Sequence, residues 1–312
     1  MSFASTLIVT GSNGFVGQSF LEYLVSNKCE FVPRKILLVN RKEAVYPKKL
    51  TNLFDVETIN IDLTAKWKFG GDHSVLLNLA ADGSANAYSS EASNKFMKIG
   101  DRLIEWTKNY NPEKVIQASS GACYGIKTIG EIESNSSQNL ERYQKKDLFI
   151  KARTYVENKL LDQSSLNNRQ VTILRLFSFI GPNILNKDQY AVSSFIKSAL
   201  TKGIINMTGN PNTVRSYLHE KEMSNIIALS LKIKDNGLIL PVGSLKAVKL
   251  IELAEFIAKK TKSKIHIEGD GIFGDIYLPS NMAFFSKLGF TERIHWKDSV
   301  VECIKFYKKG TS

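Results

Sequence analysis

Short apolar runs alternate with longer amphipathic segments along the first 180 residues of this chain. The apolar runs have the length and composition of buried strands, and they cover Thr6–Thr10, Lys35–Val39, Thr58–Ile61, Ser74–Leu79, Lys114–Ala118 and Val171–Phe177. Apolar residues recur at helical spacing over Gln18–Val25, Asn94–Tyr110 and Asp147–Ser164. Because strands of this kind are buried under helices on both faces, the pattern predicts an α/β fold built on a doubly wound parallel sheet.

The pattern is less regular after residue 180. A returning strand is predicted near 238–242, and helices over Ala191–Leu200, Lys221–Lys232, Lys249–Lys260 and Asp298–Phe306. We expect residues 1–180, with the returning strand, to form the sheet domain, and residues 181–237 and 243–312 to form a smaller C-terminal subdomain. Ligands of open α/β sheets bind at the carboxyl ends of the strands, so this subdomain is expected to bind the substrate.

A glycine-rich turn, G-S-N-G-F-V-G, connects the first predicted strand to the first predicted helix. Gly11 permits a tight turn, Gly14 lets the backbone approach a pyrophosphate, and Gly17 allows the helix to pack closely on the strand. The helix N-terminus adds backbone amides and the positive end of its dipole. The turn therefore predicts a Rossmann-type dinucleotide site, with contacts from Gly11, Asn13, Gly14, Phe15, Val16 and Gly17. A plain turn that is rich in glycine is the alternative.

The end of the second predicted strand bears on which dinucleotide is bound. An acidic residue there would bind the adenosine ribose of NAD, whereas a basic residue would accept the 2′-phosphate of NADP. The sequence has Asn40, Arg41 and Lys42 and no carboxylate, so NADP is favoured over NAD; two solvated cations are the alternative. Further cofactor contacts are expected just after the third and fourth strands, from Asp62, Leu63, Ala80 and Ala81.

Composition narrows the set of partners. The net charge is +12 and the isoelectric point is near 9.4, but the lysines are spread along the chain without an aromatic-interleaved basic stripe, so nucleic acid is not expected. No apolar run approaches the roughly 18 residues that cross a bilayer, and the N-terminus lacks the features of a signal peptide. Three widely separated cysteines predict neither a disulfide framework nor a metal site. We expect a cytoplasmic protein.

Five segments, taken together, resemble one known family: Thr10–Gly17, Asn78–Ala81, Ala118–Gly125, Arg175–Pro182 and Arg215–His219. Their order and separation are similar to those of the extended short-chain dehydrogenases/reductases, the epimerase/dehydratase group that modifies nucleotide-activated sugars. The resemblance implies an NAD(P) cofactor, a nucleotide-sugar substrate, and catalysis by a Ser or Thr, a Tyr and a Lys. Ser120 falls on the serine position. Ser178 and Arg215 fall on positions that contact the nucleotide-sugar and its diphosphate.

Two catalytic positions that the resemblance implies are substituted in this chain. Aligned through Glu157, the tyrosine position falls on Phe149 and the lysine position on Arg153. Phenylalanine has no hydroxyl and cannot act as a general acid or base, whereas Arg153 stays charged and could still hydrogen-bond the cofactor ribose. Tyr143, just ahead of this segment, is a candidate for the missing hydroxyl, with a surface tyrosine as the alternative. Ser120 could relay a proton through water.

The same resemblance narrows the reaction and the assembly. Sugar 4,6-dehydratases of this family need an Asp-Glu pair where the chain has Gly121 and Ala122. A 4-keto reductase or an epimerase in glycan precursor synthesis is therefore expected, and a catalytically impaired protein that binds the same ligands is the alternative. Members commonly pair the two helices predicted at 94–110 and 147–164, so a homodimer is expected. His219 and Cys123 are interpreted as structural residues.

Overall fold

The computed structural model of the chain describes residues 6–26, 33–71, 73–81, 87–124, 127–128, 137–167, 169–186, 190–269 and 274–310. The chain forms two compact units. Unit 1 comprises residues 1–123, 135–175 and 224–240, and unit 2 comprises residues 124–134, 176–223 and 241–312. Among the described helices, none combines the length and the hydropathy that a bilayer crossing requires.

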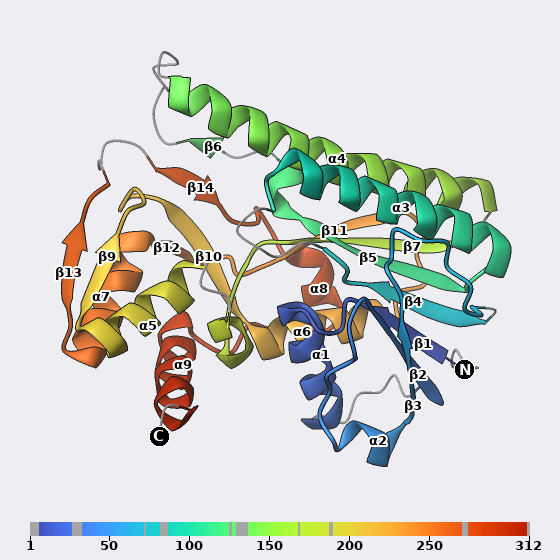
Figure 1. Cartoon of the computed structure of the whole chain (residues 1–312), viewed down its shortest axis with the longest axis horizontal. Coiled ribbons are helices and arrows are strands. Elements are labelled where there is room, and N and C mark those ends of the chain that lie inside the picture. The colour runs from blue at the N-terminus through green and yellow to red at the C-terminus, as the bar shows by residue number, and fades with distance from the viewer. Residues whose placement is uncertain are drawn as a thin grey trace. The chain divides into compact units, whose positions relative to one another are not determined.

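A seven-stranded sheet forms the centre of unit 1 (Figure 1). Its order is β11-β7-β5-β4-β1-β2-β3, and the four neighbouring pairs from β5 to β3 are all parallel. The strands are β1 (Thr6–Thr10), β2 (Lys35–Asn40), β3 (Asp55–Asn60), β4 (Ser74–Asn78), β5 (Lys114–Ser120), β7 (Gln170–Leu176) and β11 (Leu238–Val242). The order reverses at β1, between β2 and β4, which is the arrangement of a Rossmann-type doubly wound sheet. The predicted fold class is confirmed.

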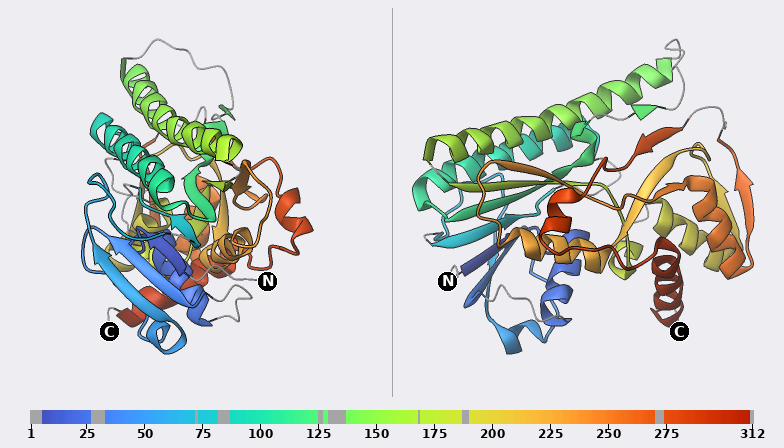
Figure 2. Two further views of the ribbon diagram at one scale, coloured as in Figure 1. Left: turned by 90° about the vertical axis from the view of Figure 1, so that its right-hand side faces the viewer. Right: turned by 180° about the vertical axis from the view of Figure 1, so that it is seen from behind.

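Helices cover both faces of this sheet because its central strands are apolar on both sides; every residue of β4 is buried. The long helices α3 (Ser90–Tyr110) and α4 (Ser137–Asn167) lie side by side on one face, and α1 (Phe15–Ser26) lies on the other (Figures 1 and 2). Tyr23 of α1 donates a hydrogen bond of 2.9 Å to Asn225 of α6 (Glu220–Ser230). The short helix α2 (Leu50–Leu53) precedes the edge strand β3.

Unit 2 contains shorter strands and four helices among its described residues. One sheet has the order β12-β10-β14-β6, with β8 beside β10, and β9 pairs with β13 in a second sheet. The strands are β6 (Lys127–Thr128), β8 (Ser178–Ile180), β9 (Ile204–Met207), β10 (Val214–His219), β12 (Ala247–Lys249), β13 (Lys264–Ile267) and β14 (Asp275–Tyr277). The helices are α5 (Ala191–Lys202), α7 (Leu250–Thr261), α8 (Ala283–Lys287) and α9 (Trp296–Gly310), and the 3₁₀ turns are η1 (Gly121–Tyr124) and η2 (Pro182–Asn186).

Several elements begin earlier than the apolar pattern predicts, among them α1 at Phe15 rather than Gln18, β3 at Asp55 rather than Thr58, and the two long helices α3 and α4. Helix α4 starts at Ser137 rather than at Asp147, because its first turns are polar and carry no apolar periodicity. Helix α3 starts at Ser90 rather than at Asn94, since the Ser89 hydroxyl accepts a hydrogen bond of 3.1 Å from the backbone amide of Ala92 and caps the helix. An N-cap of this kind satisfies one of the amides that the first helical turn leaves without a partner.

Candidate functional site

The glycine-rich turn between β1 and α1 is shaped by close backbone packing. Gly11 has a φ of +70°, and a Cβ on it would lie 2.8 Å from the Cα of Ala80 at the end of β4. A Cβ on Gly17 would lie 2.5 Å from the Cα of Ser12. A Cβ on Gly14 would meet only the carbonyl oxygen of Gly11, at 3.2 Å. Gly11 and Gly17 therefore hold the turn against the sheet, while Gly14 lies directly before α1, which begins with Phe15 and Val16.

Asn40, the last residue of β2, fastens this turn to the sheet. Its side-chain amide donates a hydrogen bond of 2.8 Å to the Ser12 hydroxyl, and its Oδ1 accepts one of 3.3 Å from the backbone amide of Asn13. Asn40 is buried, and both the nitrogen and the oxygen of its side-chain amide form hydrogen bonds within the turn. Sequence reasoning noted only the lack of a carboxylate at this position. The signal for its role was a polar residue closing an otherwise apolar strand.

The Asn13 side chain binds the segment that follows β2. It donates to the carbonyl of Glu43 at 2.7 Å and accepts from the amide of Val45 at 2.9 Å. Gln18 of α1 donates to the carbonyls of both Ser12 and Val45, at 2.8 Å and 2.7 Å. These bonds join the glycine-rich turn to residues 43–45. Asn13, expected from the sequence to contact a cofactor directly, thus uses its side chain to position this segment.

The predicted contacts follow the carboxyl ends of three strands of the sheet: β2 and β3, which are paired, and β4, which β1 separates from β2. Arg41 is exposed. Asp62 accepts hydrogen bonds of 2.9 Å from both the amide and the hydroxyl of Thr64, and these bonds, together with the charges of Lys95 and Arg41, lower the pKa of its carboxyl. The Leu63 side chain is buried in the core, and its carbonyl accepts a hydrogen bond of 2.9 Å from the Trp67 indole. At the end of β4, Ala80 is buried and Ala81 is exposed.

Ser120 ends β5 beside a buried charged network. Its hydroxyl accepts a hydrogen bond of 3.2 Å from the amide of Ala122. The neighbouring Ser119 donates to Glu157 of α4, and Arg175 of β7 donates two hydrogen bonds to the same carboxylate, at 3.1 Å and 2.6 Å. Glu157 is only 1% exposed. A bidentate arginine–carboxylate pair has fixed geometry, so the network holds the end of β5 against α4.

Phe149 and Arg153, which the sequence resemblance aligns with the expected tyrosine and lysine, are stacked on each other. The guanidinium carbon of Arg153 lies 3.6 Å from the ring centroid of Phe149 and 4.2 Å from that of Phe96 on α3. Both rings therefore contact the Arg153 guanidinium, and stacking of this kind favours a cation. The guanidinium carbon of Arg153 lies over both rings. The N–H groups of a guanidinium point outward within its plane and are the groups suited to donate hydrogen bonds to a ribose diol.

Tyr88 packs against the Phe149 ring, with the ring centroids 4.8 Å apart. The sequence did not predict that Tyr88 contacts Phe149 or that Phe96 contacts Arg153. Both contacts depend on how α3 and the turn before it pack on α4. Tyr143, the candidate named from the sequence, lies on the first turns of α4, but its side chain falls outside the part of the chain that the structure describes.

The predicted substrate residues Ser178 and Arg215 lie on neighbouring strands of unit 2. Ser178 of β8 pairs in register with Tyr217 of β10, and Arg215 is two positions before Tyr217, so side chains 178 and 215 project from the same side of the paired strands. Arg215 donates to the carbonyls of Val214 at 2.9 Å and Asp275 at 3.2 Å. These two hydrogen bonds to backbone carbonyls fix the orientation of the Arg215 guanidinium.

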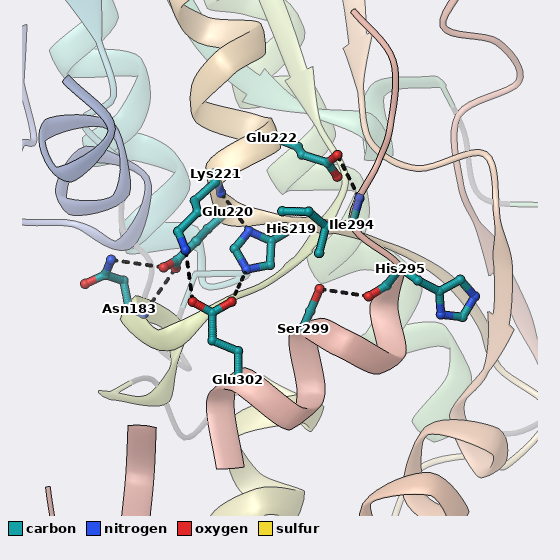
Figure 3. A network of polar contacts seen from close by, with 9 residues as sticks. All are labelled: Asn183, His219, Glu220, Lys221, Glu222, Ile294, His295, Ser299 and Glu302. Atoms are coloured by element: carbon teal, nitrogen blue, oxygen red, sulfur yellow. Dashed lines mark hydrogen bonds and ion pairs between the residues drawn. The ribbon is translucent and has the colours of Figure 1, made fainter. Parts of the chain in front are cut away.

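His219, at the end of β10, belongs to a polar network within unit 2 (Figure 3). Its Nδ1 accepts a hydrogen bond of 3.0 Å from the amide of Lys221, so its Nε2 carries the proton and donates to Glu302 of α9 at 2.8 Å. Lys221 also donates to Glu302, at 3.0 Å. Burial lowers the pKa of His219, against the opposing effect of Glu302. These contacts support the structural interpretation of His219.

The described residues contain no group of histidine, cysteine and acidic side chains with the geometry of a metal site. Cys123 lies near Ser119, and burial raises the pKa of its thiol, as does the charge of Glu157. A thiol with a raised pKa is a poor nucleophile, so Cys123 contributes packing rather than reactivity.

Comparisons with known proteins identify the family of the chain and agree with its fold. The model of the NAD-dependent epimerase/dehydratase family matches residues 7–243. The chain is 23% identical over 321 residues to UDP-N-acetyl-alpha-D-glucosaminuronate decarboxylase of Bacillus cytotoxicus, with 97% of each chain covered. It is 21% identical over 320 residues to the putative UDP-glucose 4-epimerase of Methanocaldococcus jannaschii, covering 97% of this chain and 99% of that relative.

Solved structures match over nearly the whole chain. MoeE5 in complex with UDP-glucuronic acid and NAD gives a TM-score of 0.74 at 20% identity, covering 98% of this chain and 99% of that one. The dTDP-glucose 4,6-dehydratase DesIV from Streptomyces venezuelae, solved with NAD bound, gives 0.77 at 16% identity, with 97% of each chain covered. At these identities the structural likeness shows the fold. The family model covers the sheet from its first strand to its last, and the chain belongs to the NAD-dependent epimerase/dehydratase family.

Proposed function

We propose that this protein binds a nicotinamide dinucleotide at the turn between β1 and α1 and carries out redox chemistry at a carbon of a nucleotide-activated sugar. The single observation that carries the proposal is the turn itself. Gly11 and Gly17 are packed against backbone with no room for a Cβ, and a Cβ on Gly14, directly before α1, would lie 3.2 Å from the Gly11 carbonyl oxygen. An anion is favoured at such a helix N-terminus by the helix dipole and by the amides of the first turn.

The cofactor preference rests on the end of β2. Asn40 offers no carboxylate to the adenosine ribose, and its amide is engaged by Ser12 and Asn13. Arg41 is exposed beside it and supplies a cation for a 2′-phosphate. These residues favour NADP, while two of the structural neighbours are solved with NAD. An Arg41→Ala variant should reduce NADP affinity and leave NAD affinity unchanged; an unchanged ratio of the two Kd values, measured by calorimetry, would show that the preference was wrongly assigned.

A 4-keto reductase or an epimerase is the form of this chemistry that the sequence favours, in glycan precursor synthesis. Gly121 and Ala122 follow Ser120 in η1, and neither has a group that could assist loss of water. Arg215 supplies a guanidinium suited to a diphosphate, and Ser178 projects from the same side of its paired strand. Relatives of this chain carry the names of UDP-sugar epimerases and decarboxylases, which supports a nucleotide-sugar as the substrate.

A second candidate function is binding of the same two ligands without turnover. The observation that favours it is the pair Phe149 and Arg153, which removes a hydroxyl from the expected catalytic position and replaces an ammonium by a ring-stacked guanidinium. A protein of this kind would keep its dinucleotide affinity and show no oxidation or reduction of a sugar.

Experiments on one purified preparation distinguish the two candidate functions. Its small molecules are released by denaturation and identified by mass spectrometry, and the ligand-free protein is titrated with NAD, NADP and their reduced forms by calorimetry. Reduced nicotinamide absorbance is then followed with a UDP-4-keto-hexose, and formation of the epimer is followed by chromatography with UDP-glucose, UDP-glucuronic acid and UDP-N-acetylglucosamine. Binding with oxidation of the nicotinamide or with formation of an epimer supports the enzyme, and binding with neither supports the second candidate. A folded protein that gives no heat with any dinucleotide contradicts both.

We expect the active form to be a homodimer, since related proteins pair the helices that correspond to α3 and α4. Light scattering of the purified chain tests this, and a monomer at micromolar concentration would contradict it.

A further inference from the structure

Reduction of a sugar ketone needs a proton as well as a hydride, and Phe149 cannot supply one. We propose that Tyr88, whose ring packs on Phe149, is the general acid. Its hydroxyl would donate the proton that a tyrosine at position 149 would otherwise donate. The inference rests on the proposed function, because it assigns a role within that reaction. It arises from a contact between residues that are far apart in the sequence.

Among the described side chains near Phe149 and Ser120, the Glu157 carboxyl, the Cys123 thiol and the Ser120 hydroxyl are unsuited to the task. Both oxygens of Glu157 accept hydrogen bonds from Arg175, and Ser119 donates to one of them. A carboxylate that is buried and paired in this way cannot exchange a proton without breaking the pair. The thiol of Cys123 is half-buried, and the Ser120 hydroxyl accepts a hydrogen bond from Ala122. An aliphatic hydroxyl can relay a proton but is a weak acid by itself.

Tyr88 combines a phenol with access to solvent. Its side chain is 46% exposed and precedes α3, whose N-cap is Ser89. Its ring centroid lies 4.8 Å from that of Phe149, at an interplanar angle of 42°, which is a favourable distance for two aromatic rings. Phe149 is itself buried and stacked on Arg153 at 3.6 Å. The Phe149 ring is therefore a fixed platform, and it holds the Tyr88 ring beside the position where a phenol is missing.

The proposed step balances as follows. A bound reduced nicotinamide would supply the hydride, with both electrons of its C–H bond, to the carbonyl carbon of the sugar and would itself be oxidised. The carbonyl oxygen of the sugar takes the proton of the Tyr88 O–H bond and becomes a hydroxyl. Tyr88 is left as a phenolate, and water returns its proton because the side chain is exposed. An epimerase would use the same step, run first in the direction of oxidation.

The test compares four single variants and one double variant by following oxidation of reduced nicotinamide with a UDP-4-keto-hexose, and by following formation of the epimer from each UDP-sugar named above. Tyr88→Phe removes one hydroxyl and keeps the ring, so we expect kcat to fall by about 10²–10⁴-fold, with the Kd for NADP and for the UDP-sugar unchanged. In Tyr88→Phe/Phe149→Tyr, the phenol is restored on the other side of the ring contact, and turnover should recover. Phe149→Tyr alone should leave kcat unchanged, because Tyr88 already supplies the proton, and a large gain in that variant would show that Tyr88 is not the acid. Circular dichroism confirms that each variant is folded.

Tyr155→Phe is the matched control, since Tyr155 lies on α4 and its hydroxyl donates to Asp101 at 2.8 Å; its kcat should equal that of the unmodified chain. Tyr143→Phe tests the competing candidate. The proposal is overturned if Tyr88→Phe retains full turnover, if Tyr143→Phe alone abolishes it, or if the unmodified chain binds dinucleotide and UDP-sugar without any turnover. The last result leaves the binding part of the proposed function standing. Absence of dinucleotide binding would instead contradict the proposed function itself.

Discussion

Replacing Glu157 by Gln keeps the size of a fully enclosed side chain and removes its charge. Arg175 then loses the carboxylate that receives two of its hydrogen bonds, at 3.1 Å and 2.6 Å, and Ser119 loses a charged acceptor. The Arg175 side chain is 12% exposed, so water cannot fully solvate the guanidinium in place of its partner. Removing one partner of a buried ion pair costs about 3–5 kcal/mol, and we expect the lower end of that range because Gln still offers one carbonyl oxygen.

Unfolding of unit 1 can be followed separately from that of unit 2. Trp67 and Trp106 belong to the core of unit 1, and Trp296 lies in unit 2. In a Trp296→Phe background, the fluorescence of the remaining two tryptophans reports on unit 1 alone. Urea titration should therefore show an earlier transition for Glu157→Gln, with an unchanged slope if the denatured state is the same.

The control and a double variant decide the interpretation. Asp147 and Lys151 form an exposed pair on the same helix, 2.6 Å apart, and Asp147→Asn should change the unfolding free energy by no more than about 0.5 kcal/mol. Glu157→Gln/Arg175→Met removes both charges, so its loss should be clearly smaller than the sum of the two single losses. A loss under about 1 kcal/mol for Glu157→Gln would refute the view that this pair holds β5 against α4.

Three further predictions concern unit 1. Lys114 is 2% exposed and donates to the carbonyls of Leu231 and Ile233. Burial lowers the pKa of Lys114 from 10.5 to about 8. As the pH rises, the folded state therefore loses this proton before the unfolded state does, and the unfolding free energy should rise between about pH 8 and 10.5. Lys114→Met should abolish this rise in pH-dependent urea titrations, and an equal slope in both proteins would contradict it. Gly17→Ala places a Cβ 2.5 Å from Ser12 backbone, so calorimetry should show at least about a tenfold loss of dinucleotide affinity, whereas Gly310→Ala, where a Cβ meets nothing, should show none. Arg41→Asp replaces the exposed cation directly after β2 by a carboxylate, and the NAD-to-NADP affinity ratio should rise; a fall in that ratio would be inconsistent with the assignment of this strand end.

The sheet could be predicted from the sequence because its signals are local. Each strand of the first unit is a short apolar run, and the G-x-x-G-x-x-G turn specifies where the first helix begins. The end of β3 also followed from its pattern, but its start did not, since Asp55 and Glu57 are polar residues on an exposed edge strand. The strands of unit 2 are mostly three to six residues long and too short to show a period.

The rest of the candidate site depends on contacts between distant residues. Position 149 lacks a hydroxyl in the sequence as plainly as in the structure, but its neighbour Tyr88 is 61 positions away and becomes visible only once α3 packs on α4. The same holds for Glu157, whose partner Arg175 is 18 residues distant. At position 40 the sequence shows only that a carboxylate is missing. The hydrogen bonds of Asn40 to Ser12 and Asn13 become visible only in the structure.

The hydrogen bonds from Asn13 and Gln18 to residues 43–45 have a practical consequence for anyone who wishes to redesign coenzyme preference. The segment after β2 is joined to Asn13 and Gln18 by three hydrogen bonds of 2.7–2.9 Å, and Gln18 also donates to the Ser12 carbonyl of the glycine-rich turn, so a loop transplanted from another protein would loosen the turn as well as exchange the cations. Substitution of Arg41 and Lys42, whose side chains are exposed, leaves those ties intact and is the safer route to a switched coenzyme.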